Sequence, residues 1–434
     1  MANTKTPLKK ALGAVHLWAI AVGLVISGEY FGWNYGWNAA GTVGMLWATG
    51  IVTVLYIAFV FSFTELTTAI PEAGGPFAYA NRAFGAAGAV IAAFTTLVEF
   101  LFATPAIAYA LGSYLHFLYP SLAITHTAAV MYIIFTLINL LGIKESAIFT
   151  LIVTLLAVAE LFLYLGVTAP HFKMTNFLQN GMPFGWQGVF AALPFAIWFY
   201  LAIEGVAMVA EEVKNPNRNI PIGYITGIGT LAFLALSVMV ITGGVGNWQL
   251  LSSIDYPLPQ AIGMVMGKDN HLTRIFTGIG LFGLVASFHS IITGVSRQIF
   301  ALARENYLPV FLSKVHTRFK TPYWALIASS VAGIICIYTG TTDKLIILSA
   351  LGAVCMYIIS MLSLFKLRIK EPDLKRTFTT PLYPYMPIVA LVLSVVCLIA
   401  ICYYNVALCL IFFAALLAAL LLFFALGKYK NQVV

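Results

Sequence analysis

Long apolar runs cover most of the chain, and short stretches rich in Gly, Pro and charged residues separate them. A helix needs about 20 consecutive apolar residues to span the hydrocarbon core of a bilayer, and most of the runs reach that length. The pattern therefore predicts an all-α polytopic membrane protein with twelve transmembrane helices. These helices are expected near residues 12–38, 41–70, 82–115, 122–142, 146–168, 187–210, 220–243, 274–303, 322–340, 344–366, 384–403 and 405–427.

Two of the apolar runs are interrupted at mid-depth by polar residues and glycine. The first run carries Ser, Gly and Glu at 27–29, and the sixth carries Glu204 followed by Gly205. Non-helical backbone at membrane depth is tolerated where it lines a cavity, because its N–H and C=O groups need partners there. Interrupted helices in corresponding positions of two halves indicate a transporter's substrate site. The alternative is a pair of glycine-rich packing faces.

Composition narrows the class of protein further. Hydrophobic residues make up 61% of the 434 positions and charged residues only 9%, against about 25% in ordinary globular proteins. These values exclude a soluble enzyme, a disordered scaffold and a nucleic-acid binder. We therefore expect a single transmembrane transporter domain over residues 1–434, embedded in the lipid bilayer, with no nucleic-acid partner.

The net charge of +8 reports orientation in the membrane. With the predicted helices in place, all but four of the 23 Lys and Arg residues fall on one side. Cytoplasmic loops carry such an excess, so both termini are expected in the cytoplasm, as in a multi-pass protein of a bacterial cytoplasmic (inner) membrane. The four residues on the other side are Lys173, Lys268, Arg274 and Lys344.

Signals of enzymatic or cofactor chemistry are missing from the sequence. The five cysteines lie in apolar runs without metal-ligand spacing, and the seven histidines are scattered. There is no glycine-rich loop followed by Lys-Ser or Lys-Thr that would cradle a nucleotide phosphate. We expect no metal, no cofactor and no enzymatic activity.

Four stretches resemble the amino acid–polyamine–organocation superfamily of transporters. The resemblance spans nearly the whole chain, and the second stretch is the most specific. The four stretches are the break at 27–29, residues 65–79 (ELTTAIPEAGGPFAY), residues 204–221 (EGVAMVAEEVKNPNRNIP) and residues 294–309 (GVSRQIFALARENYLP). Within the superfamily, residues 26–34 (ISGEYFGWN) look most like bacterial ethanolamine permeases.

The resemblance implies a leucine-transporter-type fold with discontinuous helices 1 and 6. It also implies secondary transport by alternating access around a central site. Two inverted five-helix repeats would occupy residues 12–168 and 187–366, followed by two peripheral helices over 384–427.

Glu29 is the most informative ionisable residue in an apolar run. It stands where relatives that carry amino acids have the last glycine of the break, and in those relatives the backbone amides hold the substrate carboxylate. A fixed carboxylate at this point attracts an ammonium group and repels another carboxylate. The alternative role for Glu29 is an N-cap that satisfies the free amides of the half-helix.

Other residues are assigned by the same resemblance, each with a structural alternative. Glu204 is a gating or protonatable group, or a brace for the unwound backbone. Trp198 is an aromatic lid that attracts a cation, or a packing or lipid-facing residue. His289 lines the site or titrates, or is a packing histidine. Glu99 faces the cavity from the third helix, and Glu160 replaces a cation site or pairs with a polar neighbour.

The expected substrate-binding residues therefore lie on helices 1, 3, 6 and 8. They are Ser27, Gly28, Glu29, Tyr30, Glu99, Phe102, Trp198, Ala202, Glu204 and His289, and the candidates for proton coupling are Glu204, Glu160 and His289. Arg297, Glu65 and Arg82 are expected near the cytoplasmic face, in an inner gate or in ordinary surface ion pairs.

The leading hypothesis is a secondary active transporter that imports a small ammonium compound without a carboxylate, namely ethanolamine. Coupling to protons is expected, with amine exchange as the other option. The alternative hypothesis is an amino acid permease or exchanger of the same superfamily. A homo-oligomer is compatible with the sequence but is not indicated by it.

Overall fold

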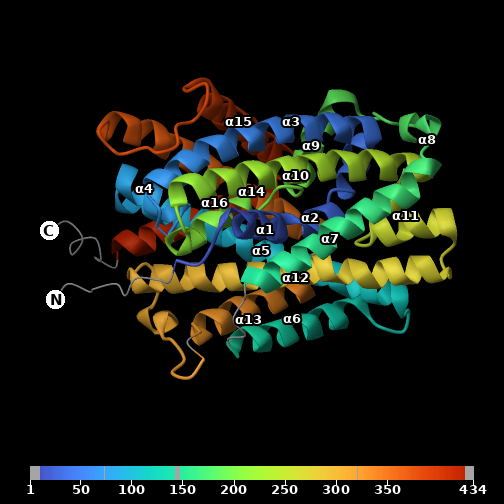
Figure 1. Ribbon diagram of the computed structural model, residues 1–434, viewed down its shortest axis with the longest axis horizontal. Coiled ribbons are helices and arrows are strands. Elements are labelled where there is room, and N and C mark those ends of the chain that lie inside the picture. Colours follow the sequence, from blue (N-terminus) through green and yellow to red (C-terminus); the bar gives the residue numbers. More distant parts are fainter. Residues whose placement is uncertain (1–9, 73, 142–146, 320, 426–434) are drawn as a thin grey trace.

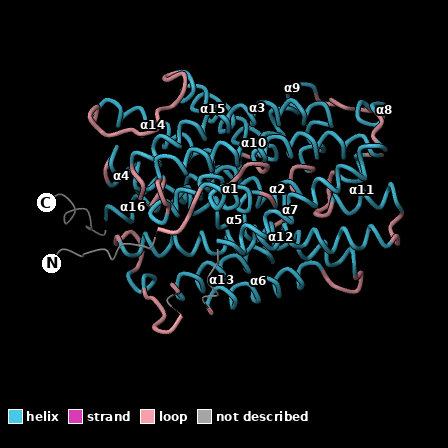
Figure 2. The backbone as a smooth tube through the Cα atoms, viewed as in Figure 1, coloured by secondary structure: helices cyan, strands magenta, loops and turns pink. Residues whose placement is uncertain are grey.

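The computed structural model describes residues 10–72, 74–141, 147–319 and 321–425, and its helices form one bundle (Figure 1). Loops gather at the two ends of the bundle, and short non-helical stretches interrupt its middle near α1 and α2 (Figure 2). The α-helices are α1 (Ala14–Val25), α2 (Ser27–Tyr30), α3 (Tyr35–Ala69), α4 (Pro76–Phe84), α5 (Ala86–Leu118), α6 (Ile124–Leu140), α7 (Ala147–Thr168), α8 (Met174–Leu178), α9 (Gly185–Ile197), α10 (Pro216–Val245), α11 (Pro257–Met266), α12 (His271–Arg304), α13 (Tyr323–Thr339), α14 (Thr342–Lys370), α15 (Tyr385–Tyr404) and α16 (Val406–Ala425). The 3₁₀ helices are η1 (Ala169–His171), η2 (Ile203–Glu212), η3 (Trp248–Leu251) and η4 (Val310–Ser313).

Eight helices in the described part of the chain are long and apolar enough to cross a membrane: α3, α5, α7 (with η1), α10, α12, α14, α15 and α16. Four shorter apolar helices, α1, α6, α9 and α13, fall in the remaining predicted segments. The prediction of an all-helical polytopic membrane protein is confirmed. That all twelve segments cross the membrane, and that two halves form inverted repeats, stay predictions.

The breaks in the first and sixth segments lie where the polar residues predicted them. α1 ends at Val25 and α2 begins at Ser27, and the backbone is then extended at Phe31. α9 ends at Ile197, and the chain continues through a turn to Ala202, whose φ of 76° is left-handed, before η2. The predicted helix 187–210 is thus α-helical only in its first half.

Two other predicted boundaries need correction. The third segment, expected from residue 82, begins at Ala86, because Gly85 takes a positive φ of 72° and separates it from the short helix α4. α3 combines the end of the first segment with the second, and Gly41, at φ 70° and ψ 179°, forms the kink between them.

The bundle has two ends, which we call the α4 face and the α8 face after the short helices there (Figure 1). α8 and α11 lie together at one end, and α4 lies at the other. α1 and α5 run through the middle of the bundle, where α5 packs on α12 and α14 and α1 packs on α10. Because Arg82 lies on α4, the charge distribution predicts that the α4 face is cytoplasmic.

Candidate functional site

The two helix breaks contact each other directly in the middle of the bundle. A Cβ atom on Gly28 would lie 2.4 Å from the carbonyl oxygen of Trp198, and one on Gly32 would lie 2.4 Å from the Trp198 indole nitrogen. Only glycine permits so close an approach between the two segments. The structure therefore brings Gly28 and Trp198, two of the predicted site residues, together.

Glu29 lies in this contact region with a fully buried side chain. Neither carboxylate oxygen has a hydrogen-bond partner among the described residues. The N-cap of α2 is Ile26, with no side-chain capping bond, so the capping role for Glu29 is not formed in this conformation. Burial of a carboxylate without a partner costs several kcal/mol, so the arrangement favours an added proton or cation.

Tyr30 and Glu160 form a hydrogen-bonded pair beside the break between α1 and α2. The Tyr30 hydroxyl lies 2.7 Å from Glu160 Oε2 and 3.0 Å from the carbonyl oxygen of Ala157. Tyr114 donates to the carbonyl oxygen of Tyr30 at 3.1 Å. Glu160 thus has the polar neighbour that its alternative role requires, and α7 is tied to the break through α2.

Glu99 of α5 and Glu204 of η2 both lie at the break in the sixth segment. The backbone N–H of Ala202 donates to Glu99 Oε1 at 3.2 Å, so Glu99 holds the left-handed turn from α5. Both carboxylate oxygens of Glu204 are buried without a donor among the described residues. Glu99 is held beside Ala202, two residues before Glu204, and burial of two neighbouring carboxyl groups in an apolar interior opposes ionisation of both.

Charge in the buried interior is one-sided. Among the described residues, the buried acidic side chains are Glu29, Glu65, Glu99, Glu160 and Glu204, and no Lys, Arg or His is buried. Of these five, only Glu65 forms an ion pair with arginine. The central site therefore offers acidic groups and no buried basic group to whatever enters it.

Aromatic rings close the route from the central site to the α8 face. Trp198 is only 3% exposed and packs edge-on against Phe31, with ring centroids 5.5 Å apart. Trp33 stacks on Phe199 at 5.5 Å and meets Trp37 edge-on at 4.8 Å. Trp198 is thus buried inside the bundle and does not face lipid.

A polar latch lies beyond the rings, between residues 251–255 and the start of α3. The Asn34 amide donates to the carbonyl oxygens of Leu251 and Ile254 at 2.6 and 2.8 Å. Tyr35 donates to Asp255 Oδ1 at 2.7 Å, and the Thr342 hydroxyl donates to Oδ2 at 3.0 Å. Burial raises the pKa of Asp255 to about 6, although these two hydrogen bonds oppose the shift.

Sequence reasoning missed this latch because its parts are some 220 residues apart in the chain. The available signals were the cluster of polar residues after Trp33 and the acidic residue in the connection between α10 and α12. Neither signal says which loop the start of α3 contacts.

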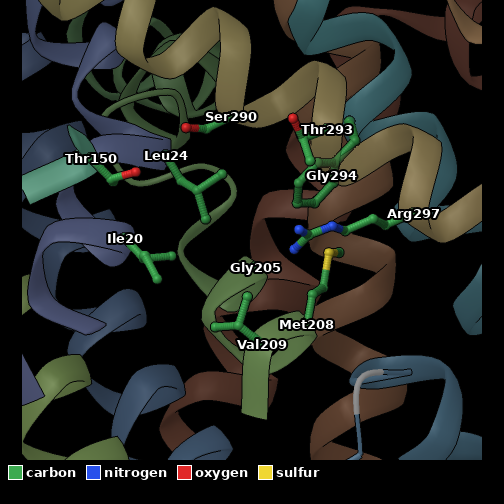
Figure 3. Close-up of a pocket in the computed structure, with 11 residues that line it drawn as sticks. Ile20, Leu24, Thr150, Gly205, Met208, Val209, Ser290, Thr293, Gly294 and Arg297 are labelled. Carbon is green, nitrogen blue, oxygen red and sulfur yellow. The ribbon is translucent and has the colours of Figure 1, made fainter. Parts of the chain in front are cut away.

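Cavities open from the central site toward the α4 face instead. One cavity, of about 60 Å³, reaches Leu24 and Gly205 beside the two breaks, and Arg297 lies across from Thr150 at its edge (Figure 3). A second cavity of about 340 Å³ shares Met208 and Arg297 with the first and continues to Gly74. Together the two cavities extend from beside the breaks toward the α4 face.

The other two residues expected in an inner gate belong to separate ion pairs. Glu65 binds Arg368 through both oxygens at 2.7 Å, lies 3.3 Å from Arg376, and also accepts from Thr380. Arg82 pairs with Glu371 at 2.6 Å, which holds the pKa of that exposed carboxyl below its ordinary value. Neither pair includes Arg297.

Three expected site residues complete the comparison with the sequence. The backbone N–H of Ser27 donates to Ser287 of α12 at 3.4 Å, which places Ser27 at the break. His289, two residues further along α12, instead contacts Asn139 of α6 at 3.0 Å, so the structure does not bring it to Glu29. Phe102 is partly buried on α5.

No group of three His, Cys, Asp or Glu side chains suited to a metal ion occurs within the described ranges.

Comparison with known proteins agrees with this architecture. Residues 12–427 match the family described as amino acid permease. The chain is 29% identical to an uncharacterised transporter of Rhizobium meliloti, over 89% of this chain and 85% of the relative. It is 28% identical to the methylthioribose transporter of Bacillus subtilis, over 88% and 86% of the two chains. It is 27% identical to the branched-chain amino acid permease BcaP of the same organism, over 88% and 85%.

The chain belongs to the amino acid permease family. Its relatives bear the names of transporters and permeases, so this is a multi-pass membrane transporter of small molecules and not an enzyme.

Proposed function

We propose that the protein is a secondary active transporter that imports a small ammonium compound lacking a carboxylate, with ethanolamine as the expected substrate. The observation that carries the proposal is the buried, unpartnered carboxylate of Glu29 beside the break between α1 and α2. An ammonium group placed there supplies the missing counter-charge. A substrate carboxylate placed there adds a second negative charge to an apolar interior.

The aromatic ring of Trp198 also favours an ammonium group as the ligand. Trp198 covers the break, and the face of an indole ring attracts an ammonium ion. Ser27, Gly28 and Tyr30 complete the wall on the first helix, and Ala202 does so on the sixth. Backbone groups released at the two breaks are available to hydrogen-bond a substrate hydroxyl.

Coupling to protons is the second part of the proposal. Glu99, which binds the N–H of Ala202, and Glu204 lie at the break in the sixth segment with no buried basic partner in the described part of the chain, so a proton on either carboxyl would offset their mutual repulsion. Glu160, which is hydrogen-bonded to Tyr30, places a further carboxyl group beside the other break, between α1 and α2. We place the protein in a bacterial cytoplasmic membrane with both termini inside.

Uptake into proteoliposomes tests the substrate assignment. Labelled ethanolamine should accumulate, and unlabelled ethanolamine and related small amines should compete with it. Leucine, serine and glutamate should compete weakly because each carries a carboxylate. Strong competition by amino acids, with no ethanolamine uptake, would contradict the proposal.

An amino acid permease is the alternative, and the names of relatives such as BcaP favour it. In that case the amides at the start of α2, of which the Ser27 N–H now donates to Ser287, would bind the substrate carboxylate, and Glu29 would have to be protonated or turned away. The same competition panel distinguishes the two functions.

A further inference from the structure

A third cavity lies on the flank of the bundle, away from the route between the two faces. It has a volume of about 400 Å³ and lies between α6, α7 and α12, with Gly23 of α1 at its back. Apolar side chains form most of its wall, including Phe135, Val153, Phe282 and Ala286. We call it the lateral cavity.

The lateral cavity opens to the outer, apolar surface of the bundle. Phe149 and Phe282, which line it, are 54% and 50% exposed, whereas Val153 in its wall is 6% exposed. Ile148 and Ile152, on the same helix as Phe149, are also exposed. Exposed large apolar side chains on a membrane-spanning helix face hydrocarbon, so the mouth of the cavity opens to lipid tails.

The inner end of the lateral cavity adjoins the cavity of about 60 Å³ that leads from the breaks to the α4 face. Thr150 and Ser290 line both spaces, and Figure 3 shows them on the side of the inner cavity away from Met208. Gly23 places α1, just before the break, at the boundary between them. An occupant of the lateral cavity would therefore touch the helix segment that borders the inner cavity.

We propose that the lateral cavity binds one acyl chain of a membrane phospholipid. Its wall is apolar except for Thr150, His289 and Ser290, and its mouth opens to the hydrocarbon, so a tail can enter while the charged headgroup stays at the surface. The cavity lies beside the first turns of α7, at the end of that helix away from α8, so the phospholipid belongs to the leaflet at the α4 face. The bound chain packs between α6, α7 and α12 and against α1 at Gly23, and so limits the movement of α1.

Photolabelling of the full-length protein in vesicles tests this assignment. The probe is a phosphatidylcholine with a diazirine in one acyl chain, and labelled positions are read by mass spectrometry. Label is expected at Val153, inside the cavity, as well as at the exposed rim. Ala286→Phe fills the cavity and should abolish the label at Val153, whereas Ala414→Phe, on the exposed surface of α16, should leave it unchanged.

Three results would overturn the proposal. One is label in the wild-type protein at Phe149 and Phe282 without any at Val153, which would mean that lipid only covers the rim. Another is equal labelling of Val153 in the wild type and the Ala286→Phe variant. The third is labelling of Val153 by a diazirine fatty acid but not by the phospholipid. Because the wild-type result decides by itself, the test stands even where Ala286→Phe reduces expression.

Discussion

Glu29 is the residue on which the proposed charge of the ligand depends. Its carboxylate is buried at the meeting point of two helix breaks, and no described residue donates to it. We expect Glu29→Gln, which keeps the volume and removes the charge, to weaken ethanolamine binding. A hydrogen bond to a charged group contributes about 1.5–3 kcal/mol, so the affinity should fall roughly 10- to 150-fold, as measured by binding curves.

Serine provides the control for this variant because it carries both an amine and a carboxylate. It should compete better with the Gln variant than with the wild type, since a repulsive charge has been removed. A melting curve for each protein separates loss of binding from loss of structure. Unchanged ethanolamine affinity in a well-folded variant would remove the reason for preferring an amine to an amino acid.

At this scale the sequence predicted the residues of the breaks but not all of their partners. Glu29 and Glu204 stand in interrupted apolar runs, so their types pointed to these positions, whereas Trp198 was assigned by the resemblance. His289 was placed by its distance along α12 from residues 294–297, and a helix turns by about 100° per residue, so a small error in phase changes the neighbour. In the structure Ser287 contacts the first segment, and His289 contacts α6.

Among the elements, the segment 251–255 and the start of α3 form a unit whose stability depends on pH. The pKa of Asp255 is about 6 in the folded protein, against 3.8 for the free side chain. The folded state therefore binds this proton more tightly, and the resulting stability is complete below about pH 3.8 and is lost as the pH rises through 6. Between pH 5 and pH 8 the loss amounts to about 1 kcal/mol.

Asp255→Asn removes this titration while keeping an oxygen that accepts from Tyr35 or Thr342. Thermal unfolding of both proteins at pH 5 and pH 8 measures the effect, because the other carboxyl groups contribute equally to both. The wild type should lose more stability than the variant on going to pH 8. An identical pH dependence in the two proteins would show that Asp255 does not titrate in this range.

Glu65 joins α3 to the chain that follows α14. The side chain is 1% exposed, and its charge is balanced by Arg368 and Arg376. Glu65→Gln leaves both guanidinium groups without a counter-charge, so the free energy of unfolding should fall by about 3 kcal/mol or more. The matched control is Glu371→Gln, which breaks the exposed pair with Arg82 and should cost within about 1 kcal/mol. Equal losses in denaturant unfolding would contradict a special role for the Glu65 cluster.

The helices themselves were largely predictable because apolar run length is a strong signal. α10, α14 and α15 begin and end within a few residues of the predicted bounds. The errors occur where one glycine conformation decides, as at Gly85 and Gly41, and in the connections, where α8 and α11 were not foreseen. Such local features depend on tertiary contacts that periodicity does not report.

For the whole molecule, the packed rings toward the α8 face and the cavities toward the α4 face fit one of the two states of the proposed alternating-access cycle. If protons drive the cycle through Glu99 and Glu204, ethanolamine uptake into proteoliposomes should rise when the outside is made acidic relative to the inside. Replacing sodium by potassium should leave uptake unchanged. Sodium-dependent uptake that ignores the proton gradient would exclude this coupling.

The one-sided charge of the interior has an electrical consequence. A carrier whose central acids are neutralised by protons or substrate on the way in must return with as few charges as it can, since among the described residues no Lys, Arg or His is buried with Glu29, Glu99, Glu160 and Glu204. Import of an ammonium ion together with a proton would then be an inward current. A potential of 100 mV, negative inside, contributes about 2.3 kcal/mol to each charge that crosses. Voltage across the membrane would thus concentrate the substrate even where the proton concentrations on the two sides are equal.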